Sequence, residues 1–177
     1  MNRRKVEVVP FQKSWKAAYL QEAEHLNDIL GDSVLNVHHI GSTSISGMGA
    51  KPILDILIEA RDIEKIDSHN GQMKVSGYDA YGENGIPGRR FFVKAIAGTR
   101  TSHVHIFAAG HPEVRRHLLF RDYLSAHPQE AAEYAKLKEN LAIQFPADID
   151  HYIDGKHDFI QGIDRKAAEW AKEAEGR

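Results

Sequence analysis

A carboxylate lies in a stretch of the sequence where a purely structural strand would not place a charge. Asp55 stands in the middle of the apolar run ILDIL, residues 53–57, which is typical of a strand that is buried on both faces. A charge in such a run costs several kcal/mol unless it is paired. Asp55 is therefore the first candidate for a catalytic role, and the alternative is a buried hydrogen-bonded structural network.

A loop rich in glycine and hydroxyl groups precedes this run. The segment 41–50, GSTSISGMGA, combines three glycines with four Ser or Thr residues. Glycine lets backbone N–H groups approach phosphate oxygens, and hydroxyl groups add further donors. We therefore expect Gly41, Ser42 and Thr43 to bind a phosphate group of a substrate, although the hydroxyl groups could equally cap their own turn. Lys51 follows the loop and could supply a positive charge to the same phosphate, or be an exposed loop lysine.

Two histidines with one residue between them form a second group of candidates. His103 and His105 lie in the run SHVHIFAA, and strand residues two apart share a face. Beside a carboxylate, imidazoles suit Zn²⁺ or Mn²⁺, whereas Mg²⁺ prefers several oxygen ligands. We therefore predict that Asp55, His103 and His105 hold a divalent metal ion, with Asp55 and His105 as the catalytic residues. The histidines could equally act as general bases without a metal.

A basic cluster stands on the strand that precedes the histidines. In RRFFVKAIA, residues 89–97, Arg90 and Lys94 share one face of the strand and Arg89 lies on the other. One face is expected to line the anion site while the other is solvated. We expect Arg90 to contribute to substrate binding.

The periodicity of the sequence predicts the elements that position these residues. Apolar side chains recur at three- and four-residue steps from Ser14 to Leu30 and predict an amphipathic helix, which Gly31 ends. A turn at 98–100 joins two strands in an antiparallel hairpin, and Pro112 and Pro128 each begin a helix. The predicted strands are 5–9, 34–40, 53–60, 89–97 and 102–109, and a further helix is predicted over 63–75.

These elements predict one α+β domain over residues 1–177, with a mixed sheet in about 1–110 and a helical extension in about 111–177. The chain is long enough to bury a core. It has no cysteine, which excludes disulfides, thiolate zinc sites and cysteine nucleophiles and fits a cytoplasmic protein. The net charge of −2 gives no global attraction to nucleic acid or acidic membranes, and no run of about 18 apolar residues predicts a membrane span.

The segment HIGSTSISGMGAKPILDI, residues 39–56, is similar to the characteristic segment of the GrpB family. Its glycine–serine pair, followed by an acid on a strand, also resembles the signature of the nucleotidyltransferase superfamily. On these residues the chain is identified as a member of the GrpB family. Further similarities run in order through nearly the whole chain: HVHIF at 103–107, FRDYLSAHP at 120–128, YAKLKENLA at 134–142, Tyr152, Lys156 and the pair Phe159 and Ile160.

The resemblance implies a nucleotidyltransferase-like mixed sheet with flanking helices. It also implies transfer of a nucleotidyl or phosphoryl group on a small nucleotide or phosphorylated substrate. Superfamily enzymes carry two acids separated by one residue, and this sequence has Leu57 in place of the second. The alternative is therefore a binding module that holds a nucleotide or phosphorylated metabolite without turnover. The sequence does not distinguish between these two functions, and it does not give the oligomeric state.

Overall fold

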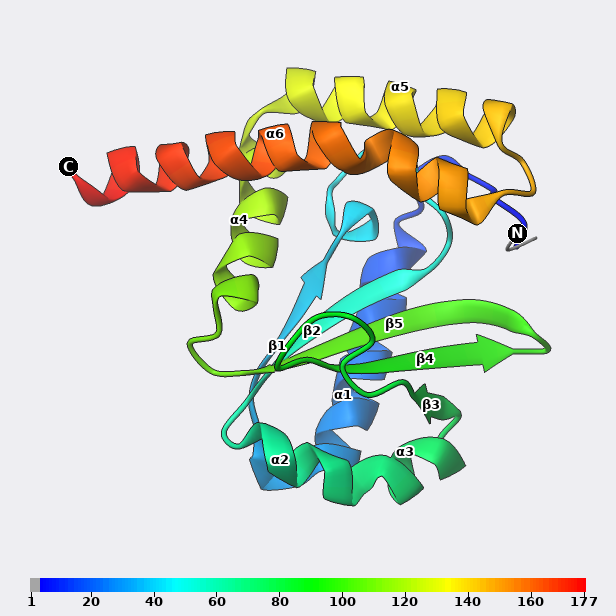
Figure 1. Ribbon diagram of the computed structural model, residues 1–177, viewed down its shortest axis with the longest axis vertical. Coiled ribbons are helices and arrows are strands. Elements are labelled where there is room, and N and C mark those ends of the chain that lie inside the picture. Colours follow the sequence, from blue (N-terminus) through cyan, green and yellow to red (C-terminus); the bar gives the residue numbers. More distant parts are fainter. Residues whose placement is uncertain (1–3) are drawn as a thin grey trace. The chain divides into compact units, whose positions relative to one another are not determined.

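The computed structural model describes residues 4–177 and shows an α+β protein built on one mixed five-stranded sheet (Figure 1). The strands are β1 (Val34–Ile40), β2 (Leu54–Ala60), β3 (Tyr78–Ala80), β4 (Arg90–Ile96) and β5 (Thr99–Ala108). Their order across the sheet is β1-β2-β5-β4-β3. β2 and β5 run parallel, and the other neighbouring strands are antiparallel. The predicted fold class is confirmed.

Six α-helices accompany the sheet within residues 4–177, and none of them is long and apolar enough to cross a membrane. Chain contacts divide the protein into two compact units. The sheet unit comprises Lys13–Ile40 and Ile53–Arg115, and the helical unit comprises residues 4–12, the loop Gly41–Pro52 and Arg116–Arg177. The helices are α1 (Ser14–Leu30), α2 (Ile63–Ile66), α3 (Asn70–Val75), α4 (Pro112–Ala126), α5 (Pro128–Gln144) and α6 (Ile149–Glu175).

The two faces of the sheet have different roles. Side chains alternate between the faces along each strand, and residues that are level on neighbouring strands share a face. Ile56, Val104 and Phe92 therefore point to one face, where they form an apolar core with α1, α2 and α3. Asp55 and His103 are level with one another and point to the other face. The core thus fixes the register that brings these two polar residues together.

The hairpin of β4 and β5 forms as predicted, with its turn one residue earlier than expected. Ala97 and Gly98 connect the strands and have φ angles of 50° and 78°. Positive φ at both central residues is what a two-residue turn with the right-handed strand twist requires. This short connection places β4 beside the histidines of β5.

Two predicted elements differ in the structure. The helix expected over 63–75 is divided by a 3₁₀ turn, Asp67–His69, which contains Asp67 and Ser68, two residue types whose side chains compete for local hydrogen bonds with the backbone. The strand expected at 5–9 is wrong, since only Val9 forms a bridge, with Ala50. Its apolar side chains instead pack in the helical unit, where Val6 is buried and its N–H donates to the carbonyl of Pro146.

The helical unit has its own apolar core. Ile45 and Met48 of the loop pack with buried side chains of α4, α5 and α6, including Leu124, Tyr134 and Ile163. α5 and α6 lie side by side (Figure 1), and Gly155 of α6 packs closely against Leu141 of α5. A Cβ atom at Gly155 would lie 3.0 Å from Cδ1 of Leu141 and closer still to its Cδ2.

Gly155→Ala is expected to lower the free energy of unfolding by about 1–2 kcal/mol, because overpacking outweighs the better helix propensity of alanine. Urea denaturation measures the change. Gly162→Ala is the matched control, because outside the adjoining helix backbone an added Cβ there meets Nη2 of Arg165 at 3.9 Å, an ordinary contact. This variant should stabilise the protein by about 0.5–1 kcal/mol. Equal gains in both variants would contradict the close approach.

Candidate functional site

The two predicted catalytic residues are in direct contact in the sheet unit. Nε2 of His105 lies 3.1 Å from Oδ1 of Asp55, and Nδ1 of His103 lies 3.7 Å from the same oxygen. The contact follows from parallel pairing of β2 and β5, which sets Asp55 level with His103. The structure therefore brings together the three residues that the sequence analysis grouped, while their roles stay predictions.

Each of these histidines has an arginine near its other ring nitrogen. Nη1 of Arg89 lies 3.4 Å from Nδ1 of His105, and Nη1 of Arg100 lies 3.5 Å from Nε2 of His103. A guanidinium group can only donate hydrogen bonds, so the nitrogen that it faces must provide the lone pair. The arrangement therefore fits tautomers in which both imidazoles direct their N–H groups toward Asp55.

Asp55 is held in its ionised form. Burial acts to raise the pKa of Asp55, but hydrogen bonding to His103 and His105 and their charges act in the opposite direction and outweigh it. The pKa of Asp55 consequently lies well below its usual range. Its side chain is 32% exposed, so a ligand can reach it. The carboxylate is thus a strong hydrogen-bond acceptor and a weak base.

Arg89 is the functional candidate that the sequence analysis missed. It is 6% exposed, its Nε donates to the carbonyl of Glu83 at 3.1 Å, and its Nη2 donates to that of Asn84 at 2.8 Å. The guanidinium carbon lies 4.6 Å from the centre of the Phe91 ring. Burial lowers the pKa of Arg89, yet the group stays charged because a guanidinium group is not deprotonated in proteins. Arg89 therefore fixes the preceding loop and presents a further donor, on Nη1, to His105.

Arg90, the predicted substrate-binding arginine, lies on the other face of the sheet. It is level with Ile106 and packs on the side of α2, where its Nε and Nη2 lie 2.7 Å and 3.2 Å from the carboxylate of Asp67. This hydrogen bond raises the pKa of Arg90. Arg90 shares the face of Ile106, which is the core face of the sheet, whereas Asp55 points to the other face. The structure thus does not bring Arg90 to Asp55.

The remaining predicted residues, Gly41, Ser42, Thr43 and Lys51, belong to the helical unit. Gly41 has a φ angle of 70°, a conformation that glycine adopts without strain, and a 3₁₀ turn follows it. Thr43 is buried, and Nζ of Lys51 lies 5.2 Å from the centre of the Tyr152 ring. The phosphate-binding roles of these four residues stay predictions.

The donor set of Asp55, His103 and His105 is one that Zn²⁺ or Mn²⁺ prefers. Within residues 4–177, however, no group of three or more His, Cys, Asp or Glu side chains has an arrangement that could hold a metal ion. The imidazoles direct N–H groups at the carboxylate and face arginines with their other nitrogens, as described above. The residues as placed do not fit a metal ion, and the chemistry proposed below uses none.

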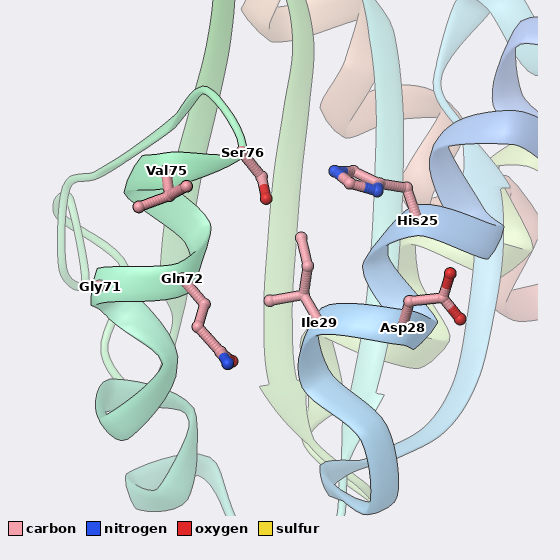
Figure 2. A pocket seen from close by; sticks show the side chains of 7 residues that line it. All are labelled: His25, Asp28, Ile29, Gly71, Gln72, Val75 and Ser76. Atoms are coloured by element: carbon pink, nitrogen blue, oxygen red, sulfur yellow. The ribbon is translucent and has the colours of Figure 1, made fainter.

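A pocket of about 380 Å³ lies elsewhere in the sheet unit, between α1 and α3 (Figure 2). His25 and Asp28 of α1 and Gln72 and Val75 of α3 line it. These helices cover the face of the sheet opposite Asp55, so the pocket does not belong to the site.

Arg89→Lys is expected to lower the free energy of unfolding by about 1–2 kcal/mol and to mix the tautomers of His105. Lysine keeps the charge but cannot contact Glu83, Asn84 and His105 at the same time. Urea denaturation and the ¹⁵N chemical shifts of the His105 ring measure the two effects. Arg165→Lys, at an exposed position of α6, should change neither. An unchanged His105 tautomer in Arg89→Lys would contradict the assigned contact.

The mixed sheet, with a carboxylate on strand β2 where it pairs parallel to β5, has a nucleotidyltransferase-like fold. The structure of Cid1 poly(U) polymerase has this fold with a TM-score of 0.50 at 12% identity, over 76% of this chain and 42% of that one. This similarity shows the fold alone. More specifically, the chain belongs to the GrpB family, whose model matches residues 5–166. The crystal structure of the conserved protein GrpB from Enterococcus faecalis has a TM-score of 0.90 at 39% identity, covering 93% of this chain and 99% of that chain.

Two curated relatives are longer than this chain. The UPF0157 protein YqkA of Bacillus subtilis is 48% identical over 170 residues, which are 96% of this chain and 49% of YqkA. A dephospho-CoA kinase of Mycolicibacterium paratuberculosis is 28% identical over 194 residues, covering 96% of this chain and 47% of the kinase. The chain thus spans about half the length of both relatives.

Proposed function

We propose that the protein transfers a nucleotidyl or phosphoryl group from a small nucleotide or phosphorylated compound to a hydroxyl group. The observation that supports this most directly is the oxygen of Asp55 that faces both His103 and His105 on one sheet face. A carboxylate that holds an imidazole in one tautomer prepares the other ring nitrogen to act as a general base. His105 is the proposed base and Asp55 its partner.

In the proposed reaction, a phosphate group of the substrate accepts a hydrogen bond from Arg89 in place of Nδ1 of His105. Nδ1 then takes the proton of the acceptor hydroxyl while the oxygen of that hydroxyl forms a bond to phosphorus. The bond from phosphorus to the leaving phosphate or pyrophosphate breaks in the same step. The negative charge of Asp55 stabilises the imidazolium that results, and general-base catalysis of this kind contributes about 10²–10⁴-fold to the rate.

Leu57 favours a second candidate function, a binding module without turnover. It occupies the position of the second acid of superfamily enzymes, on the same strand and face as Asp55, and it is fully buried. An apolar side chain there cannot bind a metal ion or stabilise charge. In this alternative, Arg89 and Arg100 bind the phosphate group, and the two histidines of β5 only orient Asp55.

The two functions are separated by measuring turnover and binding on the same preparation. Purified protein is incubated with ribonucleoside triphosphates and with dephospho-coenzyme A, each with and without Mg²⁺ or Mn²⁺. Release of phosphate or pyrophosphate above background supports the transferase. A raised melting temperature without release supports the binding module, because a ligand that binds the folded state stabilises it. If neither occurs with any compound, both functions are wrong and the structural network remains.

A further inference from the structure

The same four-residue pattern occurs on two neighbouring helices of the helical unit. Tyr134 and Lys138 on α5, and Tyr152 and Lys156 on α6, are each four residues apart, so each pair lies on one face of its helix. Nζ of Lys138 lies 4.7 Å from the centre of the Tyr134 ring, and Nζ of Lys156 lies 4.6 Å from that of Tyr152. Each tyrosine ring thus holds an ammonium group beside it.

The loop of the same unit adds a third lysine to this place. Nζ of Lys51 lies 5.2 Å from the centre of the Tyr152 ring, so Lys51 and Lys156 share one ring. Nζ of Lys138 donates a hydrogen bond of 2.6 Å to the carbonyl of Gly49, two residues before Lys51. Three positive charges therefore gather where the loop meets α5 and α6.

The burial of these groups distinguishes the cluster from a solvated lysine face. Lys138 is 2% exposed, whereas Lys51 and Lys156 are partly exposed and can meet a ligand from solvent. Burial, together with the charges of Lys156 and Lys51, lowers the pKa of Lys138 to about 7, against the opposing charge of Glu139. The ammonium groups of the three lysines therefore repel one another, and a bound anion would offset that repulsion.

We propose that Lys51 and Lys156, with the charge of the buried Lys138 added to theirs, bind a polyphosphate chain, of the kind that nucleoside di- and triphosphates carry. Such a chain spreads several negative charges over a short length, which matches three ammonium groups contributed by one loop and two helices. Lysine binds phosphate as a point charge. The cluster should therefore recognise the negative charge of the chain and not a base or a sugar. The inference goes beyond the proposed function, because it assigns to the helical unit a phosphate site of its own that does not involve Asp55.

Isothermal titration with sodium tripolyphosphate tests this site directly, and ATP serves as the second arm. Wild-type protein is expected to bind tripolyphosphate, and Lys51→Gln and Lys156→Gln are each expected to weaken that binding about 10-fold, which corresponds to one charge-assisted contact. Both lysines are partly exposed, so the variants should fold. Lys172→Gln, at an exposed position of α6, is the matched control and should bind as wild type does. Tighter binding of ATP would identify the nucleotide as the source of the chain, and equal binding would identify the chain alone.

The outcomes for this site and for the proposed reaction can be told apart. Tripolyphosphate binding that Asp55→Asn retains and Lys156→Gln loses supports the lysine site, whether or not any compound is turned over. Absence of binding to wild-type protein, or equal binding by wild type, Lys51→Gln and Lys156→Gln, overturns it. If turnover persists in Lys51→Gln and Lys156→Gln, the proposed transferase function does not depend on this site.

Discussion

Asp55→Asn is expected to reduce the turnover of the transferred group by roughly 100-fold or more while the protein stays folded, as loss of an effective general base does. Asparagine keeps the shape of the side chain and can still accept a hydrogen bond from Nε2 of His105. It removes the negative charge that would stabilise the imidazolium during proton transfer. The measurement is the release of phosphate or pyrophosphate with the compound that wild-type protein consumes.

The same substitution should change how stability depends on acid. The folded-state pKa of Asp55 lies below its unfolded value, so its contribution to stability is complete above the unfolded pKa of about 3.9 and is lost as the pH falls toward the folded pKa. Wild-type protein should therefore lose more stability than Asp55→Asn as the pH falls from 5 to 3. Urea denaturation across this range measures the difference.

Glu59→Gln is the matched control for both measurements. Glu59 lies on the same strand and face as Asp55 and also meets a histidine, with its Oε2 2.8 Å from Nε2 of His38. It has no part in the proposed reaction, so its substitution should leave turnover unchanged. Equal turnover in wild type and Asp55→Asn would contradict the assignment of His105 and Asp55 as base and partner.

Local pattern was sufficient to predict one part of this site. The position of Asp55 inside ILDIL and the two-residue spacing of His103 and His105 depend only on strand periodicity, and the structure sets these residues side by side. That all three share one face required one further fact, namely that β2 and β5 are parallel neighbours. This pairing joins segments about 50 residues apart and is fixed by the core on the opposite face of the sheet.

The local sequence pattern could not decide whether Arg89 or Arg90 lies at the site. Their alternation was predicted, but the face that carries Asp55 depends on the register of β4 against β5, which no residue of RRFFVKAIA encodes by itself. Phe91 is level with His105, so Arg89, two residues before Phe91, lies on the same side of the sheet as His105. The carbonyls of Glu83 and Asn84 hold its guanidinium group in place. The same holds for the residues 5–9, whose alternation favours a strand but which pack along the helical unit instead.

Lys138→Met is expected to abolish a large rise in stability that wild-type protein shows in mildly alkaline solution. The pKa of Lys138 is about 7 in the folded protein and about 10.4 in the unfolded chain, so between these values the unfolded state binds more protons. Stability must therefore increase with pH in this window, by about 3 kcal/mol between pH 7 and pH 9.5. Below pH 7 both states are protonated, and the full cost of burying the ammonium group is present. Methionine cannot be protonated, so the variant should lack this part of the pH dependence.

The difference between the two pH profiles isolates Lys138, because every other group that titrates above pH 7 is common to both proteins. Chemical denaturation at half-unit steps from pH 6.5 to 9.5 provides the profiles, and Lys136→Met, at an exposed position of the same helix, should follow wild type. Lys138 also donates to the carbonyl of Gly49, so the variant should be less stable at pH 9.5, where wild-type lysine is neutral and still bonded. Parallel profiles for wild type and Lys138→Met would mean that Lys138 keeps an ordinary pKa, and the repulsion that argues for an anion among the three lysines would then be absent.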